Sequence, residues 1–197
     1  MSTKRSVESA LLSWLRFKRR YTHVCTEAQV AGRHRADVLA LTPGHECVEF
    51  EVKRSWADYR ADLNKSEKYS LYGSEGLRDA SKPNRMFYAA PRELAERIRA
   101  DLDERQSPYG VVAYDDYRGH GTMFDMVSVI RKARNLHGDK PSDHMVLEMA
   151  KRMSSEIANL WLGGARDELS LPSEPGQLEP LGQEEGPTGS TSSAPSA

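Results

Sequence analysis

The 197-residue chain is 38% hydrophobic and 29% charged, which fits one globular domain with a core of its own. These figures exclude a membrane-spanning protein, because no run of residues is long and apolar enough to cross a bilayer. The first residues also lack the apolar stretch of a signal peptide, so we expect a cytoplasmic protein with no membrane partner. The two cysteines, Cys25 and Cys47, form no CxxC pair, which excludes a zinc ribbon or a disulfide framework.

The formal net charge of -1 conceals an uneven distribution of charge along the chain. Residues 170–197 hold four glutamates, no lysine or arginine, and many Pro, Gly and Ser residues, a composition that cannot bury enough apolar surface to fold. We therefore expect a folded domain over residues 1–166 and a disordered acidic tail over residues 167–197. The first 35 residues are basic instead, which suits a surface that binds a polyanion and also describes an ordinary solvated surface.

The first part of the chain predicts a helix followed by three strands. Apolar residues recur at helical spacing in SVESALLSWLRFKRR, and Ser6 is the candidate N-cap of that helix. Extended runs follow at residues 22–30, 36–41 and 46–53, and TPGH at residues 42–45 predicts a turn between the last two. Ser55, with Asp58 three residues later, resembles a capping box and opens a helix to about residue 72.

The second part predicts alternating strands and helices. Strands at residues 84–90 and 109–115 enclose a helix at residues 91–104 that begins with proline. Residues 122–133 favour a strand over a helix, because Val127 and Val129 are β-branched. Ser142 then caps an amphipathic helix that we expect to end at Gly163 and Gly164. The order predicts an α/β domain with a mixed central sheet, flanking helices and an extra C-terminal amphipathic helix.

The strand in CVEFEVKRS, residues 47–55, alternates apolar and charged side chains. Successive side chains of a strand point to opposite faces, so one face is apolar and the other carries Glu49, Glu51 and Lys53. Two interpretations are open. The strand is half-solvated with its charges in water, or its charged face holds a metal ion.

A hairpin centred on Gly44 would set Asp37 directly opposite Glu51, because the two residues are equidistant from that glycine. Like charges that face each other across strands are unfavourable unless a positive ion lies between them. Mg²⁺ takes carboxylate oxygens and keeps several waters, and Mn²⁺ is a candidate substitute. Lys53 lies on the same face beside that ion, where it would polarise the attacking water. Glu49 is either an extra ligand of the ion or, as we favour, an acid that contacts the ligands without binding the ion itself.

Glu8 gives an independent indication of a buried polar site. On a helical wheel it falls among Leu11, Leu12 and Leu15, inside the stripe that should face the core. A carboxylate there costs free energy unless it is paired or bound to a metal. The alternative is that an acid in the first turn interacts with the helix dipole and leans into solvent.

These residues, in this order, resemble the PD-(D/E)XK nuclease superfamily: a helix glutamate, RAD at residues 35–37, and EVK at residues 51–53. The strings RADVLAL, VEFEVKRSWADYRAD, RMFYAAP and GVVAYDDY are similar to the MmcB-like DNA-repair branch of that superfamily. The resemblance covers residues 8–117. It implies a restriction-endonuclease-like αβββαβ core and Mg²⁺-dependent hydrolysis of phosphodiester bonds in DNA, in DNA repair or DNA processing. Asp37 and Glu51 would be metal ligands, Lys53 would act at the water, and Glu8 would assist.

Further residues follow from the basic flank and from the helix after Ser55. Candidate contacts to nucleic acid are Arg16, Arg19, Arg20, Arg33, His34, Arg35, Lys65 and Tyr69. Candidate supporting residues are Glu49, Ser55, Asp58 and Asp62. Asp58, Asp62, Lys65 and Tyr69 fall on one side of the predicted helix after Ser55. Two interpretations of that side are open: it lines a substrate channel, or it is exposed to solvent. The alternative function is a non-catalytic DNA-binding or assembly module that keeps the nuclease fold, and RNA is not excluded as the substrate.

Overall fold

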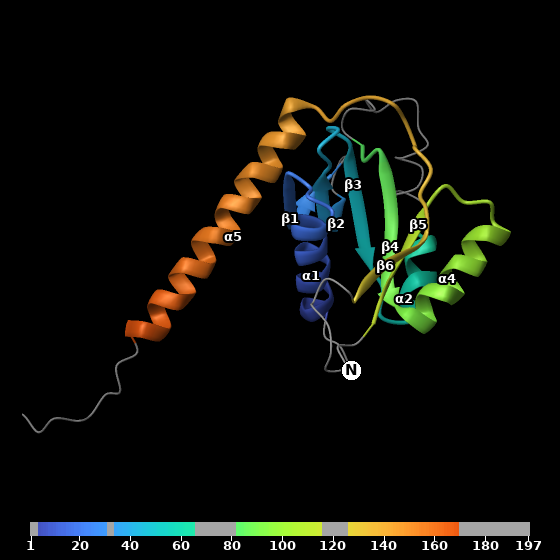
Figure 1. Cartoon of the computed structure of the whole chain (residues 1–197), viewed down its shortest axis with the longest axis horizontal. Helices are drawn as coiled ribbons and strands as arrows, with labels where there is room; N and C mark the ends of the chain where they lie inside the picture. The colour runs from blue at the N-terminus through green and yellow to red at the C-terminus, as the bar shows by residue number, and fades with distance from the viewer. Residues whose placement is uncertain (1–3, 31–33, 66–81, 116–125, 170–197) are drawn as a thin grey trace, which may run out of the picture.

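The computed structural model describes residues 4–30, 34–65, 82–115 and 126–169 (Figure 1). Helix α1 (Lys4–Ser13) continues into a π-helical turn, η1 (Trp14–Lys18). The strands are β1 (His23–Gln29), β2 (Arg35–Leu41), β3 (Cys47–Val52), β4 (Arg85–Pro91), β5 (Gly110–Tyr114) and β6 (Val127–Arg131). The other helices are α2 (Trp56–Leu63), α4 (Arg92–Glu104) and α5 (Asp143–Leu169).

The strands form one six-stranded sheet in the order β1-β2-β3-β4-β5-β6. Strands β1, β2 and β3 pair antiparallel, β3 to β4 and β4 to β5 pair parallel, and β6 returns antiparallel to β5. The parallel pairs require crossovers, and α2 and α4 lie in the two crossover segments. The predicted α/β class, with a mixed sheet flanked by helices and a C-terminal helix, is confirmed.

The turn between β2 and β3 fixes the register of the hairpin. The Thr42 hydroxyl accepts from the Glu46 N–H at 3.0 Å, and the Thr42 carbonyl accepts from the His45 N–H at 3.0 Å. Leu41 then pairs with Cys47, and the ladder runs on to Val38 opposite Phe50. This is the register centred on Gly44 that the sequence predicts.

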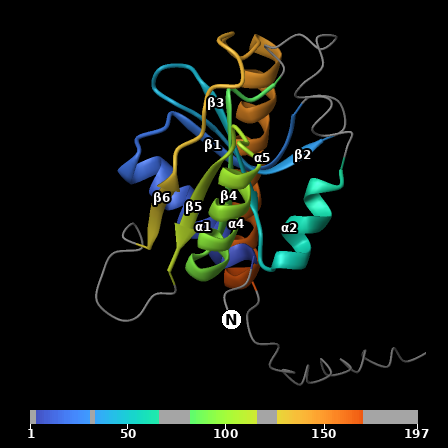
Figure 2. The same ribbon diagram turned by 90° about the vertical axis from the view of Figure 1, so that its right-hand side faces the viewer.

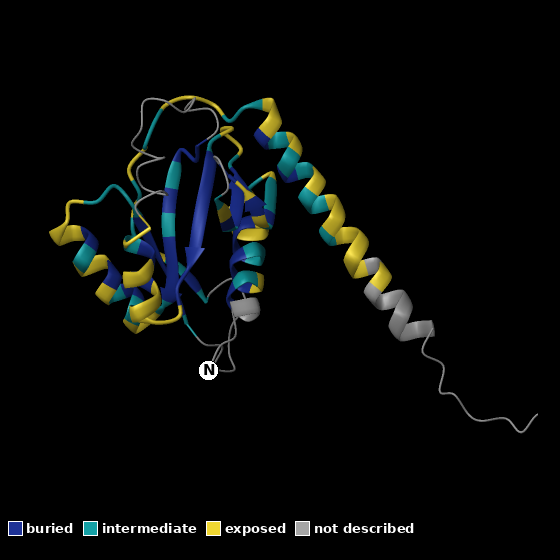
Figure 3. Cartoon of the chain, turned by 180° about the vertical axis from the view of Figure 1, so that it is seen from behind, coloured by how far each residue is buried: buried dark blue, intermediate teal, exposed yellow. Residues whose placement is uncertain are grey.

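Helices cover both faces of the sheet. On one face α1 packs through Leu11 against Val38 and Phe50. On the other face α5 packs on β1 and β2 through residues such as Met149, while α2 and α4 pack on β4 and β5 through residues such as Ile98. Figure 2 shows α4 in front of β4, with α2 beside it. Strand β3 is therefore covered on both sides, and all of its residues are buried (Figure 3).

Three predicted helix boundaries are wrong. Helix α1 already includes Lys4, so Ser6 is not its N-cap. Helix α2 ends at Leu63 rather than near residue 72, since Asn64 follows and asparagine side chains compete for backbone hydrogen bonds. Helix α5 runs through Gly163 and Gly164 to Leu169. A glycine costs a helix only about 1 kcal/mol relative to alanine, so it does not end a helix unaided.

Two other expectations meet the limits of the described chain. The predicted disorder of the acidic tail concerns residues 170–197, which lie outside the described residues. Among the helices that are described, none has the length and apolar character needed to cross a bilayer.

Candidate active site

The charged face of β3 is buried. Glu49 is 0%, Glu51 5% and Lys53 3% exposed. The interpretation of β3 as a half-solvated strand is therefore wrong, because three ionisable side chains on one face have been removed from water. Burial of a charge is costly unless an opposite charge or a metal ion compensates for it.

Pairing across the sheet explains why this face is closed. Glu49 lies between Leu39 of β2 and Met86 of β4, and Glu51 pairs with Tyr88 of β4. Leu39 belongs to the apolar cluster under α5, whereas Met86 and Tyr88 belong to the cluster under α2 and α4. The acids of β3 therefore lie at the boundary between two apolar clusters on the same face.

Lys53 is held between two carboxylates. Its Nζ lies 3.2 Å from Glu51 Oε2 and 3.3 Å from Asp62 Oδ1. Its backbone N–H donates to the Ala89 carbonyl at 2.8 Å, which fixes the end of β3 against β4. The ammonium also lies 5.8 Å from the centroid of the Tyr88 ring, within range of a cation–π contact. The two carboxylates hold the ammonium group in one position.

Helix α2 carries Asp62 into this site. Ser55 caps the helix by accepting from the Asp58 N–H at 3.1 Å, and Asp58 in turn accepts from the Arg54 N–H at 3.2 Å. The predicted cap is confirmed, and Ser55 and Asp58 act by fixing the start of α2. One and two turns on, Tyr59 is buried against the sheet and Asp62 is 1% exposed. Asp62 also accepts from the Tyr88 hydroxyl at 3.4 Å.

Tyr59 anchors the same helix to α4. Its hydroxyl donates to Asp101 Oδ2 at 2.7 Å. Burial, together with this hydrogen bond to a carboxylate, raises the pKa of Tyr59 well above its ordinary value. The phenol therefore stays neutral and serves to position α2, while Asp62 faces the charged cluster.

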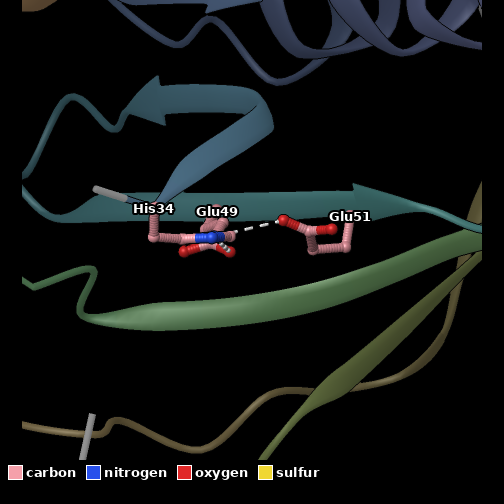
Figure 4. A group of neighbouring side chains, drawn as sticks. All are labelled: His34, Glu49 and Glu51. Carbon is pink, nitrogen blue, oxygen red and sulfur yellow. Dashed lines mark hydrogen bonds and ion pairs between the residues drawn. The ribbon is translucent and has the colours of Figure 1, made fainter. Parts of the chain in front are cut away.

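His34 joins the acids of β3. Its Nε2 lies 3.0 Å from Glu49 Oε1 and 3.3 Å from Glu51 Oε1, and Figure 4 shows the three side chains directed toward one another. One ligand atom from each residue lies within 4.8 Å of the others. Among the described residues these three form the group whose donors converge as metal ligands would. We predicted a phosphate contact for His34, and no spacing in the sequence indicates that its ring reaches these acids.

Asp37 lies beside this group and outside it. Its Oδ2 accepts from the Val52 N–H at 2.8 Å, so the side chain bonds to β3 just beyond the last ladder pair of the hairpin. Asp37 is half-buried. The Asp37 carboxylate is thus bonded to the residue that follows Glu51, while the converging ligand atoms come from His34, Glu49 and Glu51.

The remaining predicted residues lie outside the group formed by His34, Glu49 and Glu51. Glu8 is half-buried on α1, which packs against the opposite face of the sheet. The Arg16 guanidinium donates to the carbonyls of Tyr21 and Thr22 at 2.9 Å each, so it also braces the chain after η1. Arg19 stacks 5.4 Å over the Trp14 ring.

The other predicted nucleic-acid contacts lie before β1, at the start of β2, just after α2 and outside the described residues. Arg20 is exposed and has a positive φ of 57°. Arg35 is exposed, 3.4 Å from Glu27, and Lys65 is exposed, 3.1 Å from Asp62. Arg33 and Tyr69 lie outside the described residues.

Comparison with known proteins supports the architecture. No protein-family model and no curated protein matches the sequence. A solved structure from Silicibacter pomeroyi, the SPO1766 protein of unknown function, superposes with a TM-score of 0.54. The two chains share a fold. They are 19% identical, and the match covers 88% of this chain and 98% of the other. At this identity the likeness shows the fold alone.

Proposed function

We propose that this protein is a divalent-metal-dependent DNA nuclease that hydrolyses phosphodiester bonds. The observation that carries the proposal is the buried Glu51–Lys53–Asp62 chain, in which one ammonium group lies 3.2 Å and 3.3 Å from two carboxylates. A buried ionic chain is expensive to maintain for stability alone, and perturbed charged clusters occur preferentially at functional sites. The resemblance of the same residues to PD-(D/E)XK nucleases supports this interpretation of the chain.

The residues present fit a divalent cation. Glu49 and Glu51 supply buried carboxylate oxygens that converge, and Mg²⁺ and Mn²⁺ both accept oxygen ligands. When bound, such an ion lowers the pKa of water and stabilises negative charge on a phosphate. Glu51 would hold the ion, and Asp37 would complete or support the same shell from the adjacent strand.

Lys53 performs the part of the chemistry that belongs to the chain itself. An ammonium group has three N–H donors, and Glu51 and Asp62 engage two of them. The third is available to a water or to a phosphate oxygen, where a fixed positive charge stabilises developing negative charge. Asp62 and Glu51 orient this donor, and the apolar clusters on either side exclude bulk water and so strengthen its effect.

The basic flank supports a nucleic acid as the substrate. Residues 16–20 (RFKRR) follow α1, and phosphate contacts from such a flank would supply affinity without sequence preference. DNA is the substrate that the resemblance implies. We expect the flank to grip the backbone while the site on β3 cuts it.

A cleavage assay with two matched lysine variants tests the proposal. Purified protein with Mg²⁺ or Mn²⁺ is incubated with single-stranded, duplex, flap and nicked DNA and with RNA. Lys53→Met should abolish cleavage of the preferred substrate. The control is Lys82→Met, because Lys82 is equally buried and lies two residues before Asn84, whose N–H donates to the Cys47 carbonyl at the other end of β3.

Loss of folding is separated from loss of chemistry by a second variant. Removing one partner of a buried ion pair costs about 3–5 kcal/mol, so Lys53→Met is accepted only if its circular dichroism matches the parent. Glu51→Gln keeps the side-chain shape and should also abolish cleavage. Absence of cleavage by the parent with every substrate and both ions would refute the proposal, and DNA binding without cleavage would favour a non-catalytic binding module instead.

A further inference from the structure

We infer that His34, Glu49 and Glu51 form a site for a first-row transition-metal cation, one that selects Mn²⁺ over Mg²⁺. The inference deepens the proposed function, because it names the ion and two ligands that the nuclease resemblance does not supply. A catalytic role for the ion rests on the proposed nuclease function, whereas binding of the ion to these residues does not depend on that function.

The distances between the donor atoms match an octahedral ion. At a metal–ligand distance of about 2.1 Å, neighbouring octahedral ligands lie about 3.0 Å apart. His34 Nε2 lies 3.0 Å from Glu49 Oε1 and 3.3 Å from Glu51 Oε1. The histidine nitrogen thus lies at about the spacing of neighbouring octahedral ligands from both carboxylate oxygens, and all three donor atoms lie within 4.8 Å of one another.

A hydrogen-bonded cluster explains these distances less well. A neutral imidazole carries one N–H, so Nε2 can donate a single proton toward two carboxylate oxygens at once. A cation at the centre of the group would interact with all three donors. The geometry alone allows both arrangements, so the charges decide between them.

The buried charges are unbalanced toward negative. Among the described residues the buried acids are Glu49, Glu51 and Asp62 and the buried bases are Lys53 and Lys82, of which Lys53 contacts Glu51 and Asp62. Lys65, the other base on Asp62, is 61% exposed, and water screens its charge. The side chain of His34, 15% exposed, adds a charge only when protonated. A divalent cation between Glu49 and Glu51 would offset the excess.

The imidazole determines which cation fits. Mg²⁺ prefers an all-oxygen shell and gives up its waters reluctantly, whereas first-row transition metals accept imidazole nitrogen together with carboxylate oxygen. Mn²⁺ binds most weakly of the first-row divalent metals. Because even Mn²⁺ accepts imidazole nitrogen, the ligand set predicts that the site binds Mn²⁺ more tightly than Mg²⁺.

Metal binding by the full-length protein, freed of metal with a chelator, tests the inference without any substrate. Titration calorimetry should show one Mn²⁺ ion bound at least tenfold more tightly than Mg²⁺. Three-pulse electron spin-echo spectroscopy of the Mn²⁺ complex should show coupling to an imidazole ¹⁴N nucleus.

His34→Gln is the informative variant, because an amide can still donate to Glu49 but offers no imidazole ligand. It should lose the nitrogen coupling and at least tenfold in Mn²⁺ affinity, while its Mg²⁺ affinity changes by less than threefold. The control is His23→Gln at the far end of the β1–β2 hairpin, where His23 pairs with Leu41. A thermal melt of each metal-free variant confirms that the fold is intact.

The outcomes distinguish the two proposals. If His34→Gln retains Mn²⁺ affinity, or if the parent complex shows no nitrogen coupling, the inference is overturned even when DNA is cleaved with Mg²⁺. If Mn²⁺ binds through His34 but no substrate is cleaved, the metal site stands and the nuclease function fails. Equal losses of Mn²⁺ and Mg²⁺ affinity would make His34 a positioning residue and would also overturn the inference.

Discussion

The Lys53 ammonium lies 3.3 Å from Asp62 Oδ1, and both residues are almost completely buried. The contact joins the end of β3 to α2. Asp62→Asn keeps the size of the side chain and removes its charge, so Lys53 would retain Glu51 alone as its anionic partner. We expect cleavage to fall by about 10- to 100-fold, since the ammonium loses one of the two groups that orient it.

Lys65→Ala is the matched control for Asp62→Asn. It removes the exposed base on the same carboxylate, and exposed pairs contribute only about 0–1 kcal/mol. Cleavage and melting temperature should stay near those of the parent. A Lys65→Ala loss equal to that of Asp62→Asn would show that Asp62 acts by holding the helix end rather than by orienting Lys53.

Asp37 should separate a structural contribution from a chemical one. Its Oδ2 accepts the Val52 N–H at 2.8 Å, and an asparagine oxygen can accept the same hydrogen bond. Asp37→Asn should therefore change the free energy of unfolding by less than about 1 kcal/mol, whereas Asp37→Ala should cost about 1–3 kcal/mol by leaving that donor unsatisfied. Urea unfolding measures both.

The cleavage assay completes the comparison at Asp37. Under the proposed function both variants lose activity, although only Asp37→Ala loses stability. Full activity in Asp37→Asn would show that Asp37 only stabilises β3 through its hydrogen bond and takes no part in cleavage.

The hairpin and the charged face of β3 were predictable because they depend on local spacing. The equal separation of Asp37 and Glu51 from Gly44 sets the register, and alternation sets which side chains share a face. The order of helices and strands along the chain likewise follows from apolar patterns and turns. The cap at Ser55 was predictable for the same reason, since its two partners are three residues apart.

Burial of that face was not predictable, because it depends on helices that lie far along the chain. Met149 of α5 and Ile98 of α4 belong to the clusters on either side of Glu49, and no local pattern in β3 reports them. The contact of His34 with the acids of β3 was not predictable either. His34 directly precedes β2, and no pattern in the sequence indicates that its ring points toward Glu49 of β3.

The basic flank should contribute to DNA affinity through charge alone. Arg19→Gln with Arg20→Gln removes two positive charges and leaves the Arg16 hydrogen bonds to the backbone in place. The slope of log K against log salt should fall by about 0.9 for each phosphate that the variant no longer neutralises, and by similar amounts for every DNA sequence. The control is Arg99→Gln on α4, which lies on the opposite face from α1 and pairs with Glu96. An unchanged slope in the double variant would remove both residues from the interface.

Both thiols should be protected from thiol-specific reagents in the folded protein. Burial, reinforced by the nearby Glu156 carboxylate, raises the pKa of Cys25 to about 12, and burial also raises the pKa of Cys47. At pH 8 the thiolate fraction of Cys25 is then about a thousandfold below that of a free cysteine. Reaction with a chromogenic disulfide should be slow in buffer and complete within seconds in denaturant. Each protein chain should then release two reporter thiols, one for each cysteine. Rapid reaction of either thiol in buffer would show that the contact between α5 and β1 opens readily.

The end of α5 and the segment that follows it, residues 167–197, should be dispensable for folding. Met145 and Met149 are buried on β1 and β2, and Glu156 accepts from the Thr26 N–H at 2.9 Å and hydroxyl at 2.6 Å. Farther along, Leu160 is 76% exposed, and Figure 3 shows this part of the helix extending away from the sheet. Truncation after Arg166 should therefore shift the melting temperature by no more than about 2 °C, because residues 167–197 are mostly polar, Pro and Gly residues. Truncation after Ser142 should lower it by well over 10 °C, since it uncovers the cluster under α5. A large shift with the shorter deletion would mean that residues 167–197 contribute to the fold, and the domain boundary at residue 166 would then be wrong.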